Sequence, residues 1–528
     1  MSLTDLQQHM QSGRYSSHSL VEKYLDRIKD IDRNGPAITS VIELNPDAKS
    51  IASSMDALRQ AGTIVGPLQG IPVLLKDNID THDKMQSAAG SLGLVGTPAL
   101  QDATMAANLR AAGAVILGKT TLSEWANFRS FFSTSGWSGR GGQCNNPYAT
   151  DRNPCGSSSG SGAAASANFT AVSIGTETDG SIVCPACMDG VVGIKPTVGL
   201  VSRAGVVPIS HTQDTVGPHA RTVADAATVL TAIAQRKPDP RDPATSTNRN
   251  LIPRDYTKFL NPNGLKGARI GVARDFEGFS PHTDTVFEDA LTAMRSAGAT
   301  LVDVFFPHIN DINSGLNEFV VLLFDFKQDV QKYFATRVGV PLAGGTLQTA
   351  INFNNNHAAA EMPFFAQEIF DLAETFPTDP NAATPLGPSF NQALAADQLF
   401  GATEGIDLLL QQNNLKAIVA PTDTPAFPTD LINADHFVFG SSSPAAIVGY
   451  PIINVPMGFS FGVPVGISFM GTAFSEPTLI TVAAGFEAVT HARQQPKFLS
   501  TLPFNTKGEP IKTRPRHLSP GRVAPSRL

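Results

Sequence analysis

The chain of 528 residues is 42% hydrophobic and 16% charged, which is enough apolar sequence for a large core. Its formal net charge of -7 argues against a nucleic-acid partner or an anionic membrane surface. No uninterrupted apolar run of about 18 residues predicts a membrane-spanning helix, and no apolar secretory leader opens the chain, so we expect no membrane partner and a cytoplasmic protein.

Hydrophobic periodicity predicts helices and strands in the first part of the chain. Helical spacing runs through residues 1–20, 19–32 and 47–62. A short apolar run, Ile71 to Leu75, ends in Lys76 and predicts a buried strand with a charged residue at its end. Residues 105–128 then predict a helix, a glycine turn, a strand and a second helix.

The later segments continue this alternation. Strands are expected in 169–175, 265–275, 415–428 and 450–471, a helix followed by a strand in 281–306, and a final helix in 477–492. Strands alternating with helices indicate an α/β protein with a mostly parallel or mixed sheet.

No segment predicts a flexible linker between two globular halves, so we expect a single domain over residues 1–504. Within it, residues from about 235 to 400 are less patterned and are expected to shape substrate choice. Residues 505–528 form a basic, proline-rich tail that predicts disorder. The tail ends in Ser526-Arg527-Leu528, close to a peroxisomal address, which would apply only in a eukaryotic source.

The four cysteines lie close together in the sequence, at Cys144, Cys155, Cys184 and Cys187. They are too few for a disulfide-built scaffold in a chain of this length. Cys184-Pro-Ala-Cys187 has redox-like spacing, but no second cysteine pair or histidine cluster supports a metal site. We therefore expect small buried thiols, and no metal.

A serine- and glycine-rich stretch, PCGSSSGSGAAAS at residues 154–166, lies between ordered segments. A phosphate-binding loop would need a Gly-Lys-Ser/Thr ending, which is missing. Residues 156–160 formally match the G-x-S-x-G nucleophile elbow around Ser158, but a polar loop and not a buried strand precedes them. The remaining interpretation is a flexible linker, which is unusual between α/β segments.

A second glycine-serine turn, GTETDGSIVCPA at residues 175–186, follows a predicted strand. A tight turn of this kind can direct several backbone N–H groups at one point, as an oxyanion hole requires. The Ser181 hydroxyl at its end could attack a carbonyl carbon held there, provided that a base lies nearby.

The residues alone do not identify which side chain would act as the catalytic base. His211 and His219 flank a short polar segment and are interpreted as structural. Lys76 is the other candidate, because desolvation lowers the pKa of a buried lysine and leaves a neutral amine. The same side chain could equally reach solvent from the end of its strand.

Four segments together resemble the amidase signature family: residues 70–80, 154–166, 175–186 and 190–226. Residues 113–128 and 449–471 extend the resemblance over most of the chain. The resemblance is weakest in residues 235–400 and is absent from the tail. The resemblance implies a large mixed central β-sheet covered on both faces by α-helices. It also implies hydrolysis of a linear carboxamide to acid and ammonia through an acyl-enzyme, with no cofactor.

The family's Ser–cis-Ser–Lys triad transfers position by position. Lys76 would act as general base and then acid, Ser157, after a cis peptide bond, would relay the proton, and Ser181 would be the nucleophile. The resemblance places the oxyanion hole at the backbone N–H groups of Thr178, Asp179, Gly180 and Ser181.

The sequence departs from the common family pattern at the nucleophile turn. Asp179 stands where glycine is usual, and Val183 stands where arginine is usual. These departures resemble the peptide amidase branch, which hydrolyses the C-terminal carboxamide of peptides. We therefore expect a peptide or other small-molecule amide as substrate, with Asp179 and Ser158 among the residues that bind it.

Other functions compete with this one. Within the family, the chain could be a broad-specificity aliphatic or aryl amidase, or the A-type subunit of a glutamyl-tRNA amidotransferase. Outside it, the alternatives are a catalytically silent scaffold and an esterase that uses Ser158 with a distant histidine such as His436. We expect a monomer or a homodimer.

Overall fold

The structure is a computed structural model that describes residues 1–247 and 249–503. The predictions for the basic tail and for Ser526-Arg527-Leu528 lie outside the described residues. Within them, no helix is both long and apolar enough to cross a membrane.

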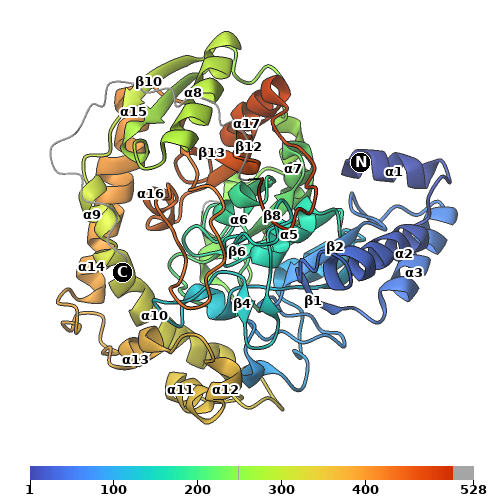
Figure 1. Cartoon of the computed structure of the whole chain (residues 1–528), viewed down its shortest axis with the longest axis horizontal. Coiled ribbons are helices and arrows are strands. Elements are labelled where there is room, and N and C mark those ends of the chain that lie inside the picture. Colours follow the sequence, from blue (N-terminus) through green and yellow to red (C-terminus); the bar gives the residue numbers. More distant parts are fainter. Residues whose placement is uncertain (248, 504–528) are drawn as a thin grey trace.

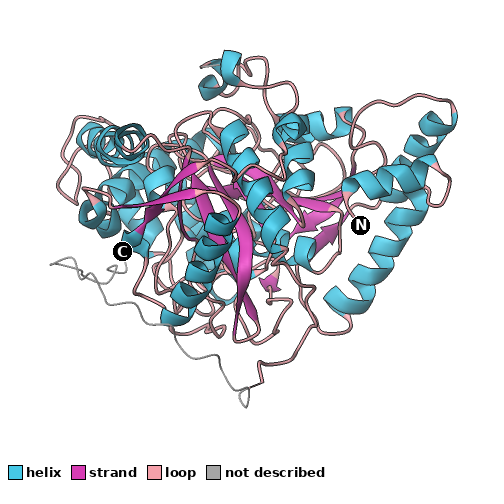
Figure 2. Ribbon diagram, turned by 90° about the horizontal axis from the view of Figure 1, so that it is seen from above, coloured by secondary structure: helices cyan, strands magenta, loops and turns pink. Residues whose placement is uncertain are grey.

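One large mixed sheet runs through the molecule, with helices on both of its sides (Figures 1 and 2). It confirms the expected α/β fold and mixed sheet. Its 11 strands are, in spatial order, β1 (Val41–Leu44), β3 (Val115–Thr120), β2 (Pro72–Lys76), β6 (Val172–Glu177), β8 (Thr215–Ala220), β7 (Val192–Lys195), β12 (Ile452–Ser460), β13 (Val463–Met470), β11 (Ala417–Pro421), β9 (Arg269–Ala273) and β10 (Thr300–Val304). A small separate sheet pairs β4 (Trp137–Ser138) with β5 (Gly142–Gln143).

The helices follow the predicted periodicity in most places. The N-terminal part contains α1 (Leu3–Gln11), α2 (Ser17–Arg27), α3 (Ala48–Gln60), α4 (Thr104–Ala111), α5 (Ser159–Ser166), α6 (Val183–Met188) and α7 (Val223–Ile233). The remainder contains α8 (Pro281–Ser296), α9 (Ile309–Ser314), α10 (Leu316–Phe334), α11 (Leu347–Asn356), α12 (Ala358–Glu361), α13 (Glu368–Glu374), α14 (Phe390–Asp397), α15 (Asp407–Gln412), α16 (Ser443–Ala446) and α17 (Glu476–Thr490).

Short 3-10 or π segments complete the list of helical elements. They are η1 (Ile28–Arg33), η2 (Leu92–Leu94), η3 (Glu124–Asn127), η4 (Pro243–Ser246), η5 (Arg249–Leu251), η6 (Tyr256–Phe259), η7 (Arg274–Phe276) and η8 (Gln398–Ile406).

The predicted helix near residue 125 is wrong. The chain forms only η3 there, and three consecutive residues, Trp125, Ala126 and Asn127, take positive φ angles of 49°, 57° and 69°. Tertiary contacts outweigh the helical periodicity, because the N–H of Ser123 donates to the carbonyl of Ser157 and that of Trp125 to Ala89. This segment therefore packs against the serine-rich loop.

The central strands β2 and β6 run parallel to each other and are buried along their whole length. Strands buried on both faces are continuously apolar, as in the Val73–Leu75 stretch. Because parallel strands end at the same edge of a sheet, Lys76 at the end of β2 comes beside Thr176 near the end of β6.

The largest apolar cluster of the described residues lies on the sheet, and a second, separate cluster lies beneath α10, α11, α13 and α14; three smaller clusters complete the core. These four helices form the olive to orange layer at the lower left of Figure 1. The second cluster includes Phe324, Phe326 and Phe370 and also the apolar residues around Trp125. The less patterned region of the sequence thus has its own packed layer.

Candidate active site

Lys76 is fully buried at the carboxyl end of β2. Its Nζ donates to Ser157 Oγ at 2.7 Å, to Thr176 Oγ1 at 2.8 Å and to the Thr176 carbonyl oxygen at 3.3 Å. The alternative in which this side chain reaches solvent is therefore wrong. The sheet edge brings together an amine and a hydroxyl that are 81 positions apart in the sequence.

The surroundings of Lys76 favour its neutral form. Burial lowers the pKa of its amine to about 7, although the charges of Asp214 and Glu177 act in the opposite direction. An amine with this pKa is about half deprotonated at neutral pH, so it can accept a proton from the hydroxyl to which it is hydrogen-bonded.

Ser157 lies in the predicted serine-rich loop, directly before α5. The Gly156–Ser157 peptide bond is cis, and the Ser157 carbonyl accepts from the N–H of Ser123 at 3.1 Å. The stretch is an ordered, buried part of the fold, so the linker interpretation is wrong.

Ser158 connects this loop to the second turn. Its N–H donates to the carbonyl of Ser181 at 3.2 Å, and its Oγ donates to the carbonyl of Thr176 at 2.9 Å. The two serine-bearing turns are therefore joined through their main chains. Direct contact of Ser158 with substrate stays a prediction, since both of these groups are used within the protein.

The esterase alternative finds no support in this geometry. The Ser158 hydroxyl is fully buried and is bonded to the backbone of Thr176. His436 is exposed and pairs with Asp430 at 3.2 Å.

The turn from Thr178 to Ser181 follows β6. The Glu177 carboxylate accepts from the N–H groups of Ile182 and Val183 at 2.7 and 2.9 Å, which fixes the start of α6. Thr178 Oγ1 donates to Asp214 Oδ1 at 2.6 Å, and Gly180 has a positive φ of 78°.

The backbone N–H groups of residues 178–181 are all without a hydrogen-bond acceptor in the described part of the protein. Ser181 itself is buried, with 7% of its surface exposed. Unused N–H groups beside a serine hydroxyl are available to stabilise an oxyanion, and the oxyanion hole at this turn stays a prediction.

Three residues of this environment were missed in the sequence: Thr176, Glu177 and Asp214. Thr176 and Glu177 end β6 and lie inside the predicted turn 175–186, and Asp214 lies in the polar segment that separates His211 from His219. Their only signal was their polar side chains in or near a predicted turn.

His219 lies in a structural position, whereas the structural role of His211, whose side chain is exposed, stays a prediction. His219 is fully buried with Nε2 3.0 Å from the Ile182 carbonyl, and burial lowers its pKa to about 4. His211 Nδ1 is 2.8 Å from Asp329 Oδ2.

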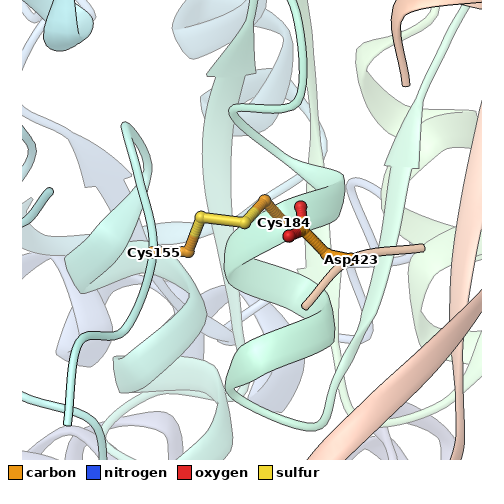
Figure 3. Close-up of side chains that lie close together, drawn as sticks. All are labelled: Cys155, Cys184 and Asp423. Atoms are coloured by element: carbon orange, nitrogen blue, oxygen red, sulfur yellow. A yellow bond between two sulfur atoms is a disulfide. The ribbon is translucent and has the colours of Figure 1, made fainter. Parts of the chain in front are cut away.

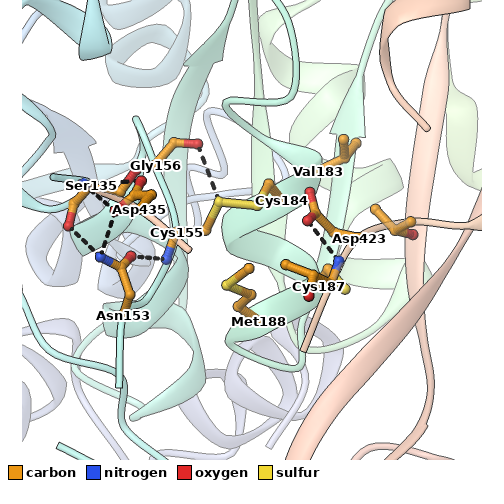
Figure 4. The surroundings of a disulfide bond; sticks show 12 residues. Ser135, Asn153, Cys155, Gly156, Val183, Cys184, Cys187, Met188, Asp423 and Asp435 are labelled. Atoms are coloured by element: carbon orange, nitrogen blue, oxygen red, sulfur yellow. Dashed lines mark hydrogen bonds between the residues drawn. A yellow bond between two sulfur atoms is a disulfide. The ribbon is translucent and has the colours of Figure 1, made fainter. Parts of the chain in front are cut away.

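The expectation that all four cysteines are free thiols is wrong for one pair. Cys155 and Cys184 form a disulfide (Figures 3 and 4), whereas Cys144 and Cys187 are free and buried, as expected. The bond was not foreseen because the partners are 29 positions apart and only the folding of the two serine-bearing turns brings them together. Asp423 lies beside both sulfur atoms.

The disulfide joins the two turns covalently. Cys155 comes two residues before Ser157, and Cys184 three residues after Ser181. The N–H of Cys155 also donates to Asn153 Oδ1 at 2.7 Å (Figure 4). The positions of the two serines therefore depend on a cross-link as well as on hydrogen bonds.

Replacing both Cys155 and Cys184 with alanine is expected to lower the thermal midpoint. A cross-link that closes a 29-residue segment stabilises the native state by roughly 3–4 kcal/mol, mainly through the unfolded chain, which corresponds to about 3 °C for a chain of this length. Thermal unfolding measures the effect. A reductant should lower the midpoint of the unmodified protein and leave that of the double variant unchanged; an unmodified protein indifferent to reductant would contradict the prediction.

Comparison with known proteins gives consistent matches. The family model described as Amidase matches residues 19–480. A probable amidase of Arabidopsis thaliana is 42% identical and covers 94% of this chain and 91% of its own length. The A-type subunit of the glutamyl-tRNA(Gln) amidotransferase from Chloroflexus aurantiacus is 31% identical over 94% of this chain and 98% of its own length.

Solved structures match as well. The peptide amidase PAM in complex with the competitive inhibitor chymostatin has a TM-score of 0.87 and 47% identity, covering 94% of this chain and 99% of that chain. The native peptide amidase from Stenotrophomonas maltophilia has a TM-score of 0.85 and 46% identity, covering 94% of this chain and 98% of that chain.

Proposed function

Because the chain belongs to the amidase family, we propose that it hydrolyses the C-terminal carboxamide of peptides to the free acid and ammonia. The family makes it a hydrolase acting on amides. The peptide amide as substrate is our proposal, and it is supported by the 47% identity to a peptide amidase over nearly the whole chain.

We assign the chemistry to Lys76, Ser157 and Ser181. Neutral Lys76 accepts the proton of Ser157 as Ser157 accepts that of Ser181, and the Ser181 oxygen forms a bond to the amide carbon. The carbonyl oxygen becomes negatively charged and is stabilised by the unused N–H groups of residues 178–181.

The tetrahedral intermediate then collapses. The C–N bond breaks, the leaving nitrogen takes a proton back through Ser157 from Lys76, and ammonia departs. Water adds to the acyl-enzyme by the same route, giving the acid and free Ser181. The 2.7 Å hydrogen bond between Lys76 Nζ and Ser157 Oγ is the single observation that carries this assignment.

Ammonia release across a panel of amides tests the substrate class. We expect peptide amides to be hydrolysed with a higher kcat/KM than simple aliphatic amides, aryl amides or urea derivatives. Equal rates for all the carboxamides would instead indicate a broad-specificity amidase, and the panel would then contradict the peptide assignment.

A second candidate function is the ammonia-supplying component of a larger amidotransferase, favoured by the 31% identity to the A-type amidotransferase subunit over 94% of this chain. The purified chain distinguishes the two candidates. An independent amidase hydrolyses amides alone, whereas an amidotransferase component would need partner chains.

A further inference from the structure

Several carboxyl groups lie in or near the proposed nucleophile turn. Asp179 lies in the turn and accepts from Ser443 Oγ at 2.6 Å through its Oδ2. Glu318, in the first turn of α10, accepts from Gln213 Nε2 at 2.8 Å, and its carboxyl lies close enough to that of Asp179 for the two to interact. The charge of Asp397, at the end of α14, acts on Glu318.

This group of side chains has acceptor atoms without donors. Asp179 Oδ1, Gln213 Oε1 and Asp397 Oδ2 are buried and have no hydrogen-bond partner among the described residues. Gln213 is fully buried, and its amide N–H₂ is already used by Glu318. A buried acceptor left unpaired costs about 1–3 kcal/mol, so Gln213 Oε1 and Asp397 Oδ2 favour a ligand that brings N–H donors, while Asp179 Oδ1 lies within reach of the Glu318 carboxyl.

The charges around Asp179 are also unbalanced. Burial, together with the charge of Asp179, raises the pKa of Glu318 well above its usual value. Burial alone raises that of Asp397 to about 8. Asp423, in the segment after β11, adds a further carboxyl whose pKa burial raises and on which the charge of Asp179 acts.

One buried cation faces this group. The charge of Asp179 acts on Lys195 at the end of β7, whose Nζ donates to the Tyr450 carbonyl at 2.6 Å. Across residues 1–247 and 249–503, no lysine, arginine or histidine forms an ion pair with Asp179, Glu318 or Asp397. Carboxyls that are close together and without a bonded base either keep a proton or favour an added positive charge.

We infer that Asp179, Glu318 and Asp397, with Gln213, bind a cationic group on the acyl side of the substrate. The group is an ammonium or a guanidinium, because both carry several N–H donors and a positive charge. It would come either from a free α-amino group or from a basic side chain next to the scissile carboxamide. The inference rests on the proposed amide hydrolysis and adds to it the charge of the preferred substrate.

Two matched pairs of substrates separate these sources. The first pair is leucinamide and Nα-acetyl-leucinamide, which differ in the α-ammonium. The second is Nα-acetyl-argininamide and Nα-acetyl-citrullinamide, which differ in the guanidinium charge. We expect kcat/KM to favour the cationic member of at least one pair by about tenfold or more, as for a close, partly desolvated charge pair.

Variants locate the preference in the carboxylates. Glu318→Gln keeps the shape and the contact with Gln213 but cannot ionise when a cation binds, and it should bring the ratio of cationic to neutral kcat/KM close to one. Asp397→Asn should lower the same ratio. It provides the test of the cation site if Glu318→Gln does not fold. Asp311→Asn, which removes an exposed carboxylate paired with His308, is the matched control and should leave the ratio unchanged.

The outcomes distinguish this inference from the function on which it rests. A wild-type ratio near one in both pairs, or a ratio that survives in Glu318→Gln, would overturn the cation site while neutral amides are still hydrolysed. If none of the four amides releases ammonia, the proposed hydrolysis itself fails.

Discussion

Replacing Ser181 with alanine is expected to lower kcat for amide hydrolysis by about 10⁴-fold or more, since removal of a serine nucleophile eliminates the covalent route. The side chain lies at the end of a turn whose N–H groups are unused, and the substitution removes one oxygen atom without altering that turn. Ammonia release under saturating peptide amide measures the loss.

A buried serine of the same region provides the control. Ser161 on α5 is fully buried, and its Oγ is bonded to Thr120 Oγ1 and to the Ile174 carbonyl. Ser161→Ala should cost stability and retain turnover. Full activity in Ser181→Ala, or its loss in Ser158→Ala alone, would move the nucleophile to another serine and revive the esterase hypothesis.

Replacing Lys76 with methionine is expected to lower kcat/KM by about 10²- to 10⁴-fold, the usual contribution of a general base. In the unmodified protein, log kcat/KM should rise with a slope of one up to about pH 7 and then level off, because burial lowers the pKa of the amine to about 7 and only the neutral amine accepts a proton. The residual activity of Lys76→Met should lack this ionisation. A pH–rate profile measures both effects.

Two further variants separate the base from a merely buried lysine. Lys119 on the neighbouring strand β3 is also fully buried, and its Nζ donates to Ser87 Oγ at 2.9 Å. Lys119→Met should lower stability and leave the ionisation near pH 7 in place. Asp214→Asn removes a charge that raises the pKa of Lys76 and should shift the rise to lower pH; a shift to higher pH would contradict the assignment.

Much of the fold could be predicted because the central strands carry strong local signals. The Ile71–Leu75 run predicts a buried strand from its composition alone, and β2 lies there as expected. The helix expected around Trp125 failed because its contacts with the serine-rich loop come from distant residues. Local periodicity cannot encode such contacts.

The sequence predicted which residue types form the candidate site. It did not predict which of these residues are bonded to one another. The residues alone left Lys76 equally compatible with solvent exposure, and the resemblance to a family decided in favour of a buried base. The disulfide between Cys155 and Cys184, and the bond between Thr178 and Asp214, both depend on how separate segments meet. Neither sequence spacing nor composition specifies which distant segments come into contact in the fold.

The separate apolar cluster beneath α10, α11, α13 and α14 has a consequence for how selectivity can change. Lys76, Ser157 and Ser181 belong to the sheet and its turns, whereas Glu318 and Asp397 stand on helices that pack on this second cluster, which they share with Trp125. Substitutions confined to the surfaces of α10 and α14 that carry Glu318 and Asp397 are therefore expected to alter the charge preference of the proposed hydrolysis, provided that the shared packing around Trp125 is kept.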